Sequence, residues 1–209
     1  MKVTLYGASG IIGSRVLAEL LARGHQVTAV ARHTEKLKAG NGLALKQGDI
    51  SDVKAVADTA SGADAAISAF GPGTENPGIL LDVTRSLIDG LKQAGVKRFI
   101  MVGGAGSLEV APGVKLIDAP NFPAAWKGIA QAHAEALEIL RKSDLDWTSF
   151  SPAALIEPGQ RTGKFRLGKD NLVTDAKGES HISAEDYAIA LVDELEKPEH
   201  VRARFTAAY

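Results

Sequence analysis

The sequence predicts an α/β protein with a Rossmann-like, doubly wound parallel sheet, and three observations point to this fold class. A short apolar strand at residues 2–6 leads directly into regularly spaced glycines. Strand and helix patterns then alternate along most of the chain, which is typical of parallel strands joined by helical crossovers. The chain has 209 residues, of which 45% are hydrophobic, enough for one domain with a substantial core. We expect a single domain over residues 1–209, with a dinucleotide-binding core at 1–151 and a small C-terminal elaboration on the substrate side at 152–209.

The N-terminal glycines have the spacing G-x-x-G-x-x-G of a dinucleotide-binding turn. Gly7 allows the tight turn, Gly10 lets the backbone approach a pyrophosphate, and Gly13 lets the following helix pack closely on the sheet. Phosphate is attracted to the N–H groups and the positive dipole end at the start of such a helix. A second strand at 26–31 completes a βαβ unit of about 30 residues, so we expect dinucleotide binding rather than an ordinary glycine-rich turn. A P-loop is disfavoured because Ser14-Arg15 follows Gly13 in place of Lys-Ser or Lys-Thr.

The remaining elements follow from short apolar runs and the residues that flank them. Further strands are expected at 42–48, 65–70, 96–102 and 147–151, and helices from Ser51 as N-cap to about residue 61, at 79–93 and at 124–141. The segment 108–123, which contains three prolines, is expected to be a loop. Beyond residue 152 the pattern predicts short strands at 164–166, 172–174 and 202–206, and a helix capped by Ser183.

Charge and composition exclude several classes of function. The net charge is −1, so nothing favours nucleic acid or an anionic membrane as a partner. The absence of cysteine excludes disulfides, thiolate catalysis and cysteine-ligated metals, and suits a reducing cytosol. The five histidines lack metal-ligand spacing, so no metal is expected. A strand begins at residue 2 and no apolar run approaches the roughly 18 residues of a membrane helix, so we expect a cytoplasmic protein without a signal peptide.

The residues after the second strand bear on which nicotinamide cofactor is preferred. NAD-binding domains usually place an acid there to bind the ribose 2′-OH, whereas this chain has Ala31-Arg32-His33. The Arg32 guanidinium would clamp a 2′-phosphate through charge-assisted hydrogen bonds worth about 1.5–3 kcal/mol, with His33 and Lys36 as helpers. The alternative is a solvated arginine, and the nearby Glu35 argues against the clamp. We expect NADP(H) to be preferred over NAD(H).

Six stretches of the chain resemble one known group of proteins. They are GASGIIG at 7–13, GDI at 48–50, SAFGPG at 68–73, VGGAGS at 102–107, SPAA at 151–154 and ISAEDYA at 182–188. Together they resemble the atypical short-chain dehydrogenases/reductases with NmrA-like domains, and most closely the proteins described as NADH-flavin reductases. The first stretch marks the superfamily, whereas VGGAGS together with SPAA is more specific to the flavin-reductase-like branch.

The resemblance implies a cofactor neighbourhood that runs along the ends of the predicted strands. It places Gly7, Ser9, Gly10, Ile11 and Ile12 around the pyrophosphate. It places Asp49 and Ile50 beside the adenine, and Ala69, Phe70 and Gly71 beside the adenosine ribose. It places Gly103, Gly104, Ser151, Pro152, Ala153 and Ala154 along the nicotinamide. The alternative for Phe70 is core packing, and for Asp49 a charge at a helix N-terminus.

The chain departs from the superfamily at the acid/base pair. Typical members use Tyr-x-x-x-Lys on the helix after the fifth strand, with a serine beside it. Here that place reads Phe122 to Gly128, the serine position reads Gly103-Gly104, and the three tyrosines are at 6, 187 and 209. Hydride transfer to a flavin does not need that proton donor, because water can supply the proton. The resemblance therefore implies NAD(P)H-dependent reduction of a flavin or similar planar acceptor, which is also the expected small-molecule partner. The alternatives are a non-catalytic redox sensor of NmrA-like type and an epimerase- or dehydratase-like enzyme.

Three residues are candidates for a catalytic role. Trp126 would stack on a substrate ring or pack as a lid, and Lys127 would reach the nicotinamide ribose or be solvated. Ser107 follows the glycine-rich turn but has no base near it in sequence, which disfavours a nucleophile. His133 is expected to be an ordinary surface or capped histidine of its helix. The segment 160–175 is expected to form a mildly basic rim of the acceptor pocket.

Overall fold

The computed structural model describes residues 1–32 and 39–209, and its centre is an eight-stranded sheet. The strands of this sheet are β1 (Lys2–Tyr6), β2 (Gln26–Ala31), β3 (Leu43–Gln47), β4 (Ala65–Ser68), β5 (Arg98–Val102), β8 (Asp146–Ser151), β10 (Arg166–Gly168) and β12 (Ala203–Ala208). Their order is β10-β12-β8-β5-β4-β1-β2-β3, and every neighbouring pair is parallel except β10 with β12. The chain therefore has the Rossmann-like fold predicted from its sequence.

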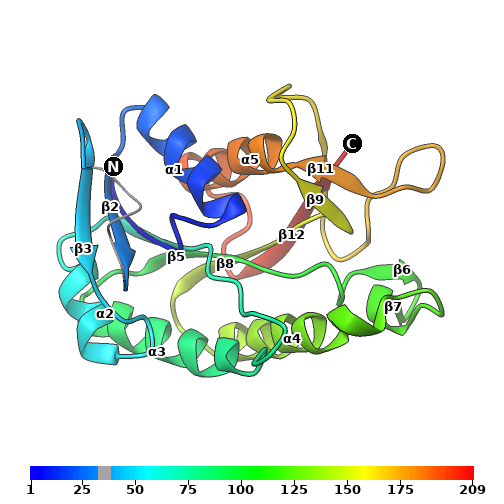
Figure 1. Cartoon of the computed structure of the whole chain (residues 1–209), viewed down its shortest axis with the longest axis horizontal. Helices are drawn as coiled ribbons and strands as arrows, with labels where there is room; N and C mark the ends of the chain where they lie inside the picture. The colour runs from blue at the N-terminus through cyan, green and yellow to red at the C-terminus, as the bar shows by residue number, and fades with distance from the viewer. Residues whose placement is uncertain (33–38) are drawn as a thin grey trace.

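Within the described residues, five helices cover the two faces of the sheet (Figure 1). Helices α1 (Ile11–Ala22) and α5 (Ala184–Glu196) lie on one face and pack against each other. Helices α2 (Val53–Ala60), α3 (Ile79–Gln93) and α4 (Lys127–Arg141) lie on the other. Because helices cover both faces, the central strands are largely enclosed, and all four residues of β4 are buried.

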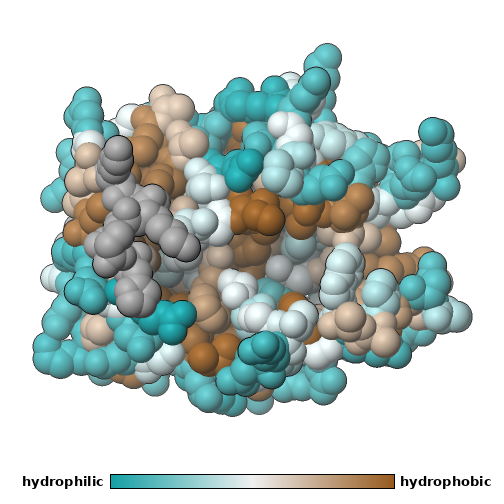
Figure 2. Space-filling model, viewed as in Figure 1, coloured by the Kyte–Doolittle hydropathy of each residue, from teal (hydrophilic) through white to brown (hydrophobic). Residues whose placement is uncertain are grey.

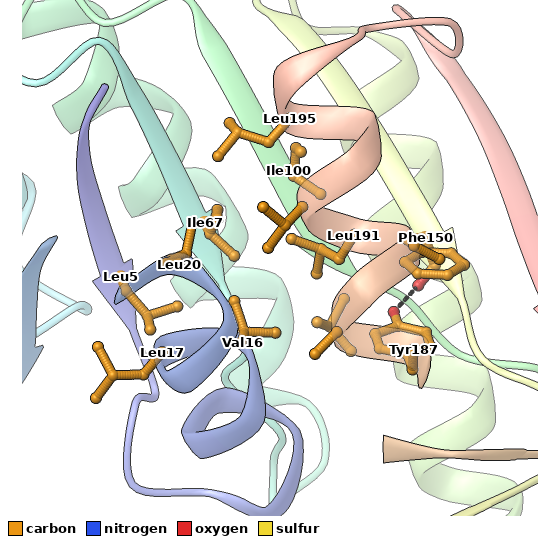
Figure 3. Packing of buried hydrophobic residues seen from close by; sticks show 14 of the residues in the cluster. Leu5, Val16, Leu17, Leu20, Ile67, Ile100, Phe150, Tyr187, Leu191 and Leu195 are labelled. Carbon is orange, nitrogen blue, oxygen red and sulfur yellow. Dashed lines mark hydrogen bonds between the residues drawn. The ribbon is translucent and has the colours of Figure 1, made fainter. Parts of the chain in front are cut away.

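A hydrophobic core fills each space between the sheet and a helical layer. Figure 3 shows the core under α1 and α5, where Val16 and Leu20 of α1 and Leu191 of α5 point toward the strands. The Phe150 ring at the end of β8 stacks on Tyr187 and on Phe205, with centroids 3.9 and 4.0 Å away. The Tyr187 hydroxyl donates to the Phe150 carbonyl (Figure 3), so α5 is joined to the carboxyl end of β8 by a hydrogen bond as well as by apolar packing.

Most helix and strand predictions agree with the structure, but the N-cap of α2 does not. Asp52, rather than Ser51, is the N-cap, and its carboxylate accepts hydrogen bonds from the N–H groups of Lys54 at 2.8 Å and Ala55 at 3.4 Å. Both residue types cap helices well, so the sequence alone did not separate them. Ser183 is the N-cap of α5, as predicted.

Short elements account for the other differences. The segment 108–123, expected to be a loop, contains the strands β6 (Glu109–Ala111) and β7 (Val114–Lys115) and the 3-10 helix η1 (Leu116–Asp118). A second 3-10 helix, η2 (Ala124–Trp126), precedes α4. The strand predicted at 172–174 is absent, whereas β9 (Leu155–Glu157) pairs with β11 (His181–Ser183). Elements of two or three residues are too short for a hydrophobic period to reveal them.

The C-terminal region also takes part in the main sheet. Strands β10 and β12 extend the sheet beside β8, and α5 supplies half of one helical layer. Among the residues described, no helix has the length and hydropathy needed to span a bilayer.

Candidate functional site

The turn between β1 and α1 is shaped by its three glycines. Gly7 has a φ of +80°, and a Cβ there would lie 2.7 Å from the backbone of Ala69. A Cβ on Gly13 would lie 2.0 Å from the Gly7 carbonyl oxygen, so α1 starts directly against the turn. A Cβ on Gly10 would meet only that oxygen, at 3.5 Å, so the space beyond Gly10 is open. The turn is therefore closed toward the protein and open toward a ligand.

The start of α1 is suited to an anion. Gly10 is the N-cap and offers no side-chain hydrogen bond, and the first turn of the helix has no acidic residue. The unpaired N–H groups and the positive end of the helix dipole therefore face the open side of the turn. This is the geometry that holds pyrophosphate in dinucleotide-binding folds, and the residues present fit such a group.

A cavity of about 160 Å³ lies at the carboxyl ends of four neighbouring strands. It brings together six residues that the sequence assigned to the cofactor site, namely Gly7, Ser9, Arg32, Asp49, Ile50 and Phe70. Its other lining residues are Val30, Ala31, Gly48, Ser51, Ile79 and Val83. Ile79 and Val83 were missed by sequence reasoning. Their i,i+4 spacing at the start of a helix that follows a strand end was the available signal.

Polar contacts order the rim of this cavity. Arg32 is exposed there, and its carbonyl oxygen accepts a hydrogen bond from the Gln47 amide at 3.2 Å. One Asp49 carboxylate oxygen accepts the N–H of Ser51 at 2.9 Å, which tightens the turn into α2. Asp49 thus has a local structural role as well as a place in the cavity lining. The predicted helpers His33 and Lys36, and the opposing Glu35, lie outside the described residues.

The residues assigned to the nicotinamide lie beyond this cavity, at the ends of β5 and β8. The Gly103 N–H donates to the Phe150 carbonyl at 2.8 Å, and a Cβ on Gly103 would lie 2.9 Å from Ser149 Oγ. Ser151, Pro152 and Ala153 are buried, whereas Ala154 is exposed and donates its N–H to Ser180 Oγ at 3.1 Å.

The other assigned residues surround the glycine turn and the end of β4. Ala69 packs beneath Gly7 and donates its N–H to the Tyr6 carbonyl at 2.9 Å. Gly71 is exposed, Ile11 is 59% exposed, and Ile12 packs against the core under α1.

Of the three catalytic candidates, Ser107 has a clear structural task. Its Oγ and its carbonyl oxygen accept hydrogen bonds from the Arg204 guanidinium, at 2.8 and 3.1 Å. Arg204 also pairs with Asp170 at 2.6 Å, so Ser107 helps to join the turn after β5 to β12. Trp126 is 51% exposed and Lys127, which begins α4, is exposed.

Large apolar side chains are exposed near this edge of the sheet. Ile11 follows the glycine turn, Trp126 precedes α4 and Leu155 follows the end of β8; Trp126 and Leu155 are 51% and 46% exposed. Figure 2 shows hydrophobic surface along a hollow that runs between the two helical layers. Such a surface suits a flat, apolar ligand.

All three tyrosine hydroxyls are engaged inside the fold. Tyr6 contacts Thr59 and the Val56 carbonyl, and burial raises its pKa to about 12. Burial also raises the pKa of Tyr187, whose hydroxyl donates to a backbone carbonyl. The Tyr209 hydroxyl lies 2.8 Å from the Asp186 carboxylate. Each tyrosine hydroxyl of the chain therefore already has a hydrogen-bond partner within the fold.

His133 does not behave as the surface histidine that its sequence context suggested. Its ring packs against Gly104, where a Cβ would lie 2.7 Å from the His133 Cβ and 3.0 Å from its Cγ. Burial lowers the pKa of His133 to about 4. The alanines around His133 concealed this position, because small residues let the helix approach the glycine turn closely. Gly104 and His133 are thus adjacent at the carboxyl end of β5.

The segment 160–175, predicted to form a basic rim of the acceptor pocket, is partly tied to other elements of the fold. Arg161 does not face a pocket freely, because its guanidinium pairs with Glu19 of α1 at 2.9 Å. The hydrogen bonds from Arg161, followed by those from Arg23, keep the Glu19 pKa below its ordinary value against the effect of burial. Asp186 binds the N–H groups of Thr162 and Gly163 at 2.7 and 2.8 Å, so this loop is tied to α5.

Among the described residues, three side chains lie close enough together to hold a metal ion, although the sequence predicts no metal. Ligand atoms of Asp175, Glu179 and His181 lie within 4.8 Å of one another. The Asp175 carboxylate already accepts the N–H groups of Lys177 and Glu179, at 2.8 and 2.9 Å, and these bonds lower its pKa. The cluster is therefore explained as a tight loop between β10 and β11.

Comparison with known proteins supplies the family. The family described as NAD(P)H-binding matches residues 7–198. The chain belongs to this NAD(P)H-binding family. The Bacillus subtilis (strain 168) protein named "Uncharacterized protein YwnB" is 42% identical over 212 residues, which cover 99% of this chain and 97% of YwnB.

Two solved structures are similar to this chain over nearly their whole length. One, from Bacteroides thetaiotaomicron and described as a "putative epimerase", is 49% identical, has a TM-score of 0.93, and covers 100% of this chain and 96% of its own. The other is from Streptococcus pneumoniae TIGR4 and is described as a "putative NADH-flavin reductase". It is 36% identical with a TM-score of 0.89, and the match covers 100% of this chain and 99% of that one. The expected resemblance to NAD(P)-binding proteins of the short-chain dehydrogenase/reductase type, with an NADH-flavin reductase among the similar structures, is thereby confirmed. The two descriptions differ in reaction, so the site must decide between them.

Proposed function

We propose that this protein is an NADPH-dependent reductase that transfers a hydride to a flavin or a similar planar acceptor. The observation that carries the proposal is the cavity at the carboxyl ends of β1 to β4, together with the open glycine turn beside it. Gly7, Ser9 and Gly10 would hold the pyrophosphate by their backbone, and Ile50, Phe70 and Ile79 would enclose the adenine and its ribose. When bound, the nicotinamide would supply the hydride.

Arg32 carries the preference for NADPH in this proposal. It is exposed at the rim of the cavity, where a 2′-phosphate on the adenosine ribose would project. No acid among the described cavity residues other than Asp49 competes for it, and Asp49 is engaged with the backbone of Ser51. A guanidinium suits this role because its charged donors match phosphate geometry.

The engaged tyrosines favour reduction of a planar acceptor over epimerisation. Alcohol oxidation and sugar epimerisation need a positioned acid or base, and all three hydroxyls of the chain's tyrosines have partners inside the fold. Reduction of a flavin needs chiefly that the two rings stack and that water is excluded. The exposed apolar side chains of Ile11, Trp126 and Leu155 would offer such a surface. The cytoplasmic location expected from the sequence is part of the proposal, and cell fractionation tests it.

Calorimetry and steady-state kinetics test the proposal. Wild-type protein should bind NADPH more tightly than NADH and should oxidise it in the presence of FMN, FAD or riboflavin. Arg32→Ala should weaken NADPH by about 10- to 150-fold, the equivalent of about 1.5–3 kcal/mol, and leave NADH nearly unchanged. Arg141→Ala, which removes an equal charge at the far end of α4, is the matched control and should change neither.

The outcomes of these measurements distinguish the proposed function from its alternatives. Equal losses for both nucleotides in Arg32→Ala would remove the arginine assignment. Tight NADPH binding without turnover of any flavin or quinone would indicate a redox sensor. Turnover of a nucleotide sugar but of no flavin would favour the epimerase-like reading.

A further inference from the structure

Helix α4 lies unusually close to the glycine turn that follows β5. A Cβ on Gly106 would lie 2.6 Å from the Cβ of Ala130, and a Cβ on Gly104 would lie 2.7 Å from the Cβ of His133. Positions 130 and 133 are one turn apart, so both lie on the same face of α4. The turn and the helix therefore touch at two consecutive points, and His133 is the polar residue at this contact.

The two ring nitrogens of His133 are in different environments. Nδ1 is shielded from solvent and has no hydrogen-bond partner in the described chain. Nε2 is not among the enclosed unpaired atoms, and none of the hydrogen bonds between described residues involves it. The ring edge that carries Cδ2, the neighbour of Nε2, is the one that faces Gly104, at 3.3 Å from its Cβ position. Nε2 is thus free to meet solvent or a ligand beside the end of β5.

The charge and tautomer of the ring follow from this placement. Burial alone lowers the pKa of His133 to about 4, and no neighbouring charged group contributes to the shift. The ring is neutral at physiological pH and carries one proton. A buried N–H without a partner is rarer than a buried unpaired acceptor, so the proton belongs on the accessible Nε2. His133 then presents one neutral N–H donor toward the open side.

We propose that His133 is a positioning and specificity-determining residue, whose neutral imidazole donates its Nε2–H to a carbonyl oxygen or ring nitrogen of an uncharged, planar heteroaromatic or quinone acceptor. The inference rests on the proposed function, since it assigns a polar contact to the acceptor of that reaction. The geometry that carries it is the unpaired imidazole against Gly104, one of the residues assigned to the nicotinamide side of the site. A neutral donor recognises a carbonyl without adding a charge that would attract carboxylates.

The same contact would favour the reaction. A hydride brings two electrons and one hydrogen to the acceptor while NADPH becomes NADP⁺, and the acceptor atom conjugated to the new bond gains negative charge. The His133 N–H stabilises that charge and remains on the imidazole, because a neutral imidazole is a poor acid. The single proton that completes the two-electron reduction would come from water.

The test compares two variants with wild-type protein and uses riboflavin and menadione, two uncharged probes, in the presence of NADP⁺. His133→Leu keeps apolar volume against Gly104 but removes the donor, and His133→Gln keeps a neutral N–H donor. His133→Leu should raise the dissociation constant for riboflavin about tenfold, the usual weight of one neutral hydrogen bond. Its dissociation constant for NADP⁺ should stay at the wild-type value, and His133→Gln should restore much of the riboflavin affinity.

A second measurement, NMR of the His133 ring, is made on wild-type protein and so does not depend on how a variant folds. The ¹⁵N resonances of the His133 ring, identified by their loss in His133→Gln, should show the Nε2–H tautomer and remain those of a neutral ring at pH 5.5. Saturating riboflavin should shift the Nε2 signal. A Leu variant that binds riboflavin as wild type does, or an Nε2 signal unmoved by both probes, would overturn the assignment.

These outcomes separate the inference from the function on which it rests. If wild-type protein reduces riboflavin with NADPH and His133→Leu does so with unchanged kcat and KM, the reductase stands and the role of His133 is refuted. If wild-type protein binds NADPH but reduces neither probe, the reductase is refuted. In that event a ring signal that still shifts with either probe supports His133 as a ligand contact, and one that does not shift refutes it.

Discussion

Two substitutions in the glycine turn should separate folding from cofactor binding. In Gly13→Ala the new Cβ would lie 2.0 Å from the Gly7 carbonyl oxygen and 2.8 Å from its carbon. Ordinary contact begins near 3.4 Å, so α1 must move away from the turn by about 1.4 Å. Overpacking of this kind costs about 1–3 kcal/mol, and a backbone neighbour places the cost at the upper end. The higher helix propensity of alanine offsets this cost by about 1 kcal/mol, so the free energy of unfolding should fall by about 2 kcal/mol in total.

Gly10→Ala is the matched control, since it adds the same methyl group three residues earlier. Gly10 has a φ of −77°, which any residue adopts, and its Cβ would meet only the Gly7 oxygen at 3.5 Å. Stability should therefore stay within about 0.5 kcal/mol of wild type. The methyl group would instead occupy the space through which the backbone approaches the pyrophosphate, so NADPH should bind at least about tenfold more weakly.

Thermal unfolding and calorimetry with NADPH measure the two effects. For a chain of this length a loss of 2 kcal/mol lowers Tm by about 4–8 °C, and Gly13→Ala should show that shift together with weakened binding. Gly10→Ala should show weakened binding at a wild-type Tm. A Gly13→Ala protein with both wild-type Tm and wild-type affinity, or a Gly10→Ala protein that binds NADPH normally, would refute the reasoning.

Three further predictions concern buried polar groups. The pKa of His133 is about 4 in the folded state and about 6.5 in the unfolded state, so the unfolded chain binds the extra proton in between. The free energy of unfolding is therefore at its full value above pH 6.5. It falls by up to about 3 kcal/mol as the pH is lowered toward 4. Urea unfolding at several pH values should show this loss in wild type and not in His133→Gln, and parallel curves would contradict it. Glu194→Ala should cost about 3–5 kcal/mol in the same assay, because it removes a buried carboxylate and leaves the half-buried Arg98 guanidinium, paired with it at 2.9 Å, without a carboxylate partner; a loss below 1 kcal/mol would show that water reaches Arg98. Tyr187→Phe removes one hydrogen bond to the Phe150 carbonyl but keeps the ring stack, so about 1 kcal/mol should be lost, and a loss above 3 kcal/mol would contradict a simple hydrogen-bond effect.

The order of elements in the first half of the chain could be predicted because local signals agreed there. Strand β2 at Gln26–Ala31 and helix α3 at Ile79–Gln93 have the predicted bounds. Each is long enough to show a period, and α3 is followed by Gly95 with a positive φ. The pair β9 and β11 could not be predicted in this way. Its strands are three residues long and are separated by the 23 residues between Glu157 and His181, so their pairing depends on tertiary contact.

Part of the candidate site could also be predicted, because local sequence signals locate the ends of the strands. Gly7, Arg32 and Asp49 each follow a predicted strand and Phe70 ends one, and parallel strands bring their carboxyl ends to one edge of the sheet. The environment of a single side chain was not predictable. Ser107 holds Arg204, which is 97 residues later in the chain, and Arg161 is paired with Glu19, 142 residues earlier.

The sequence by itself determined the parallel α/β fold and the glycine turn between β1 and α1, because both depend on hydrophobic period and on glycines that act on their own neighbours. Only the tertiary structure decided that the tyrosine hydroxyls are engaged and that the His133 ring is neutral beside Gly104. Burial and hydrogen-bond partners set the charge and availability of a side chain, and those partners come from segments that are distant in sequence.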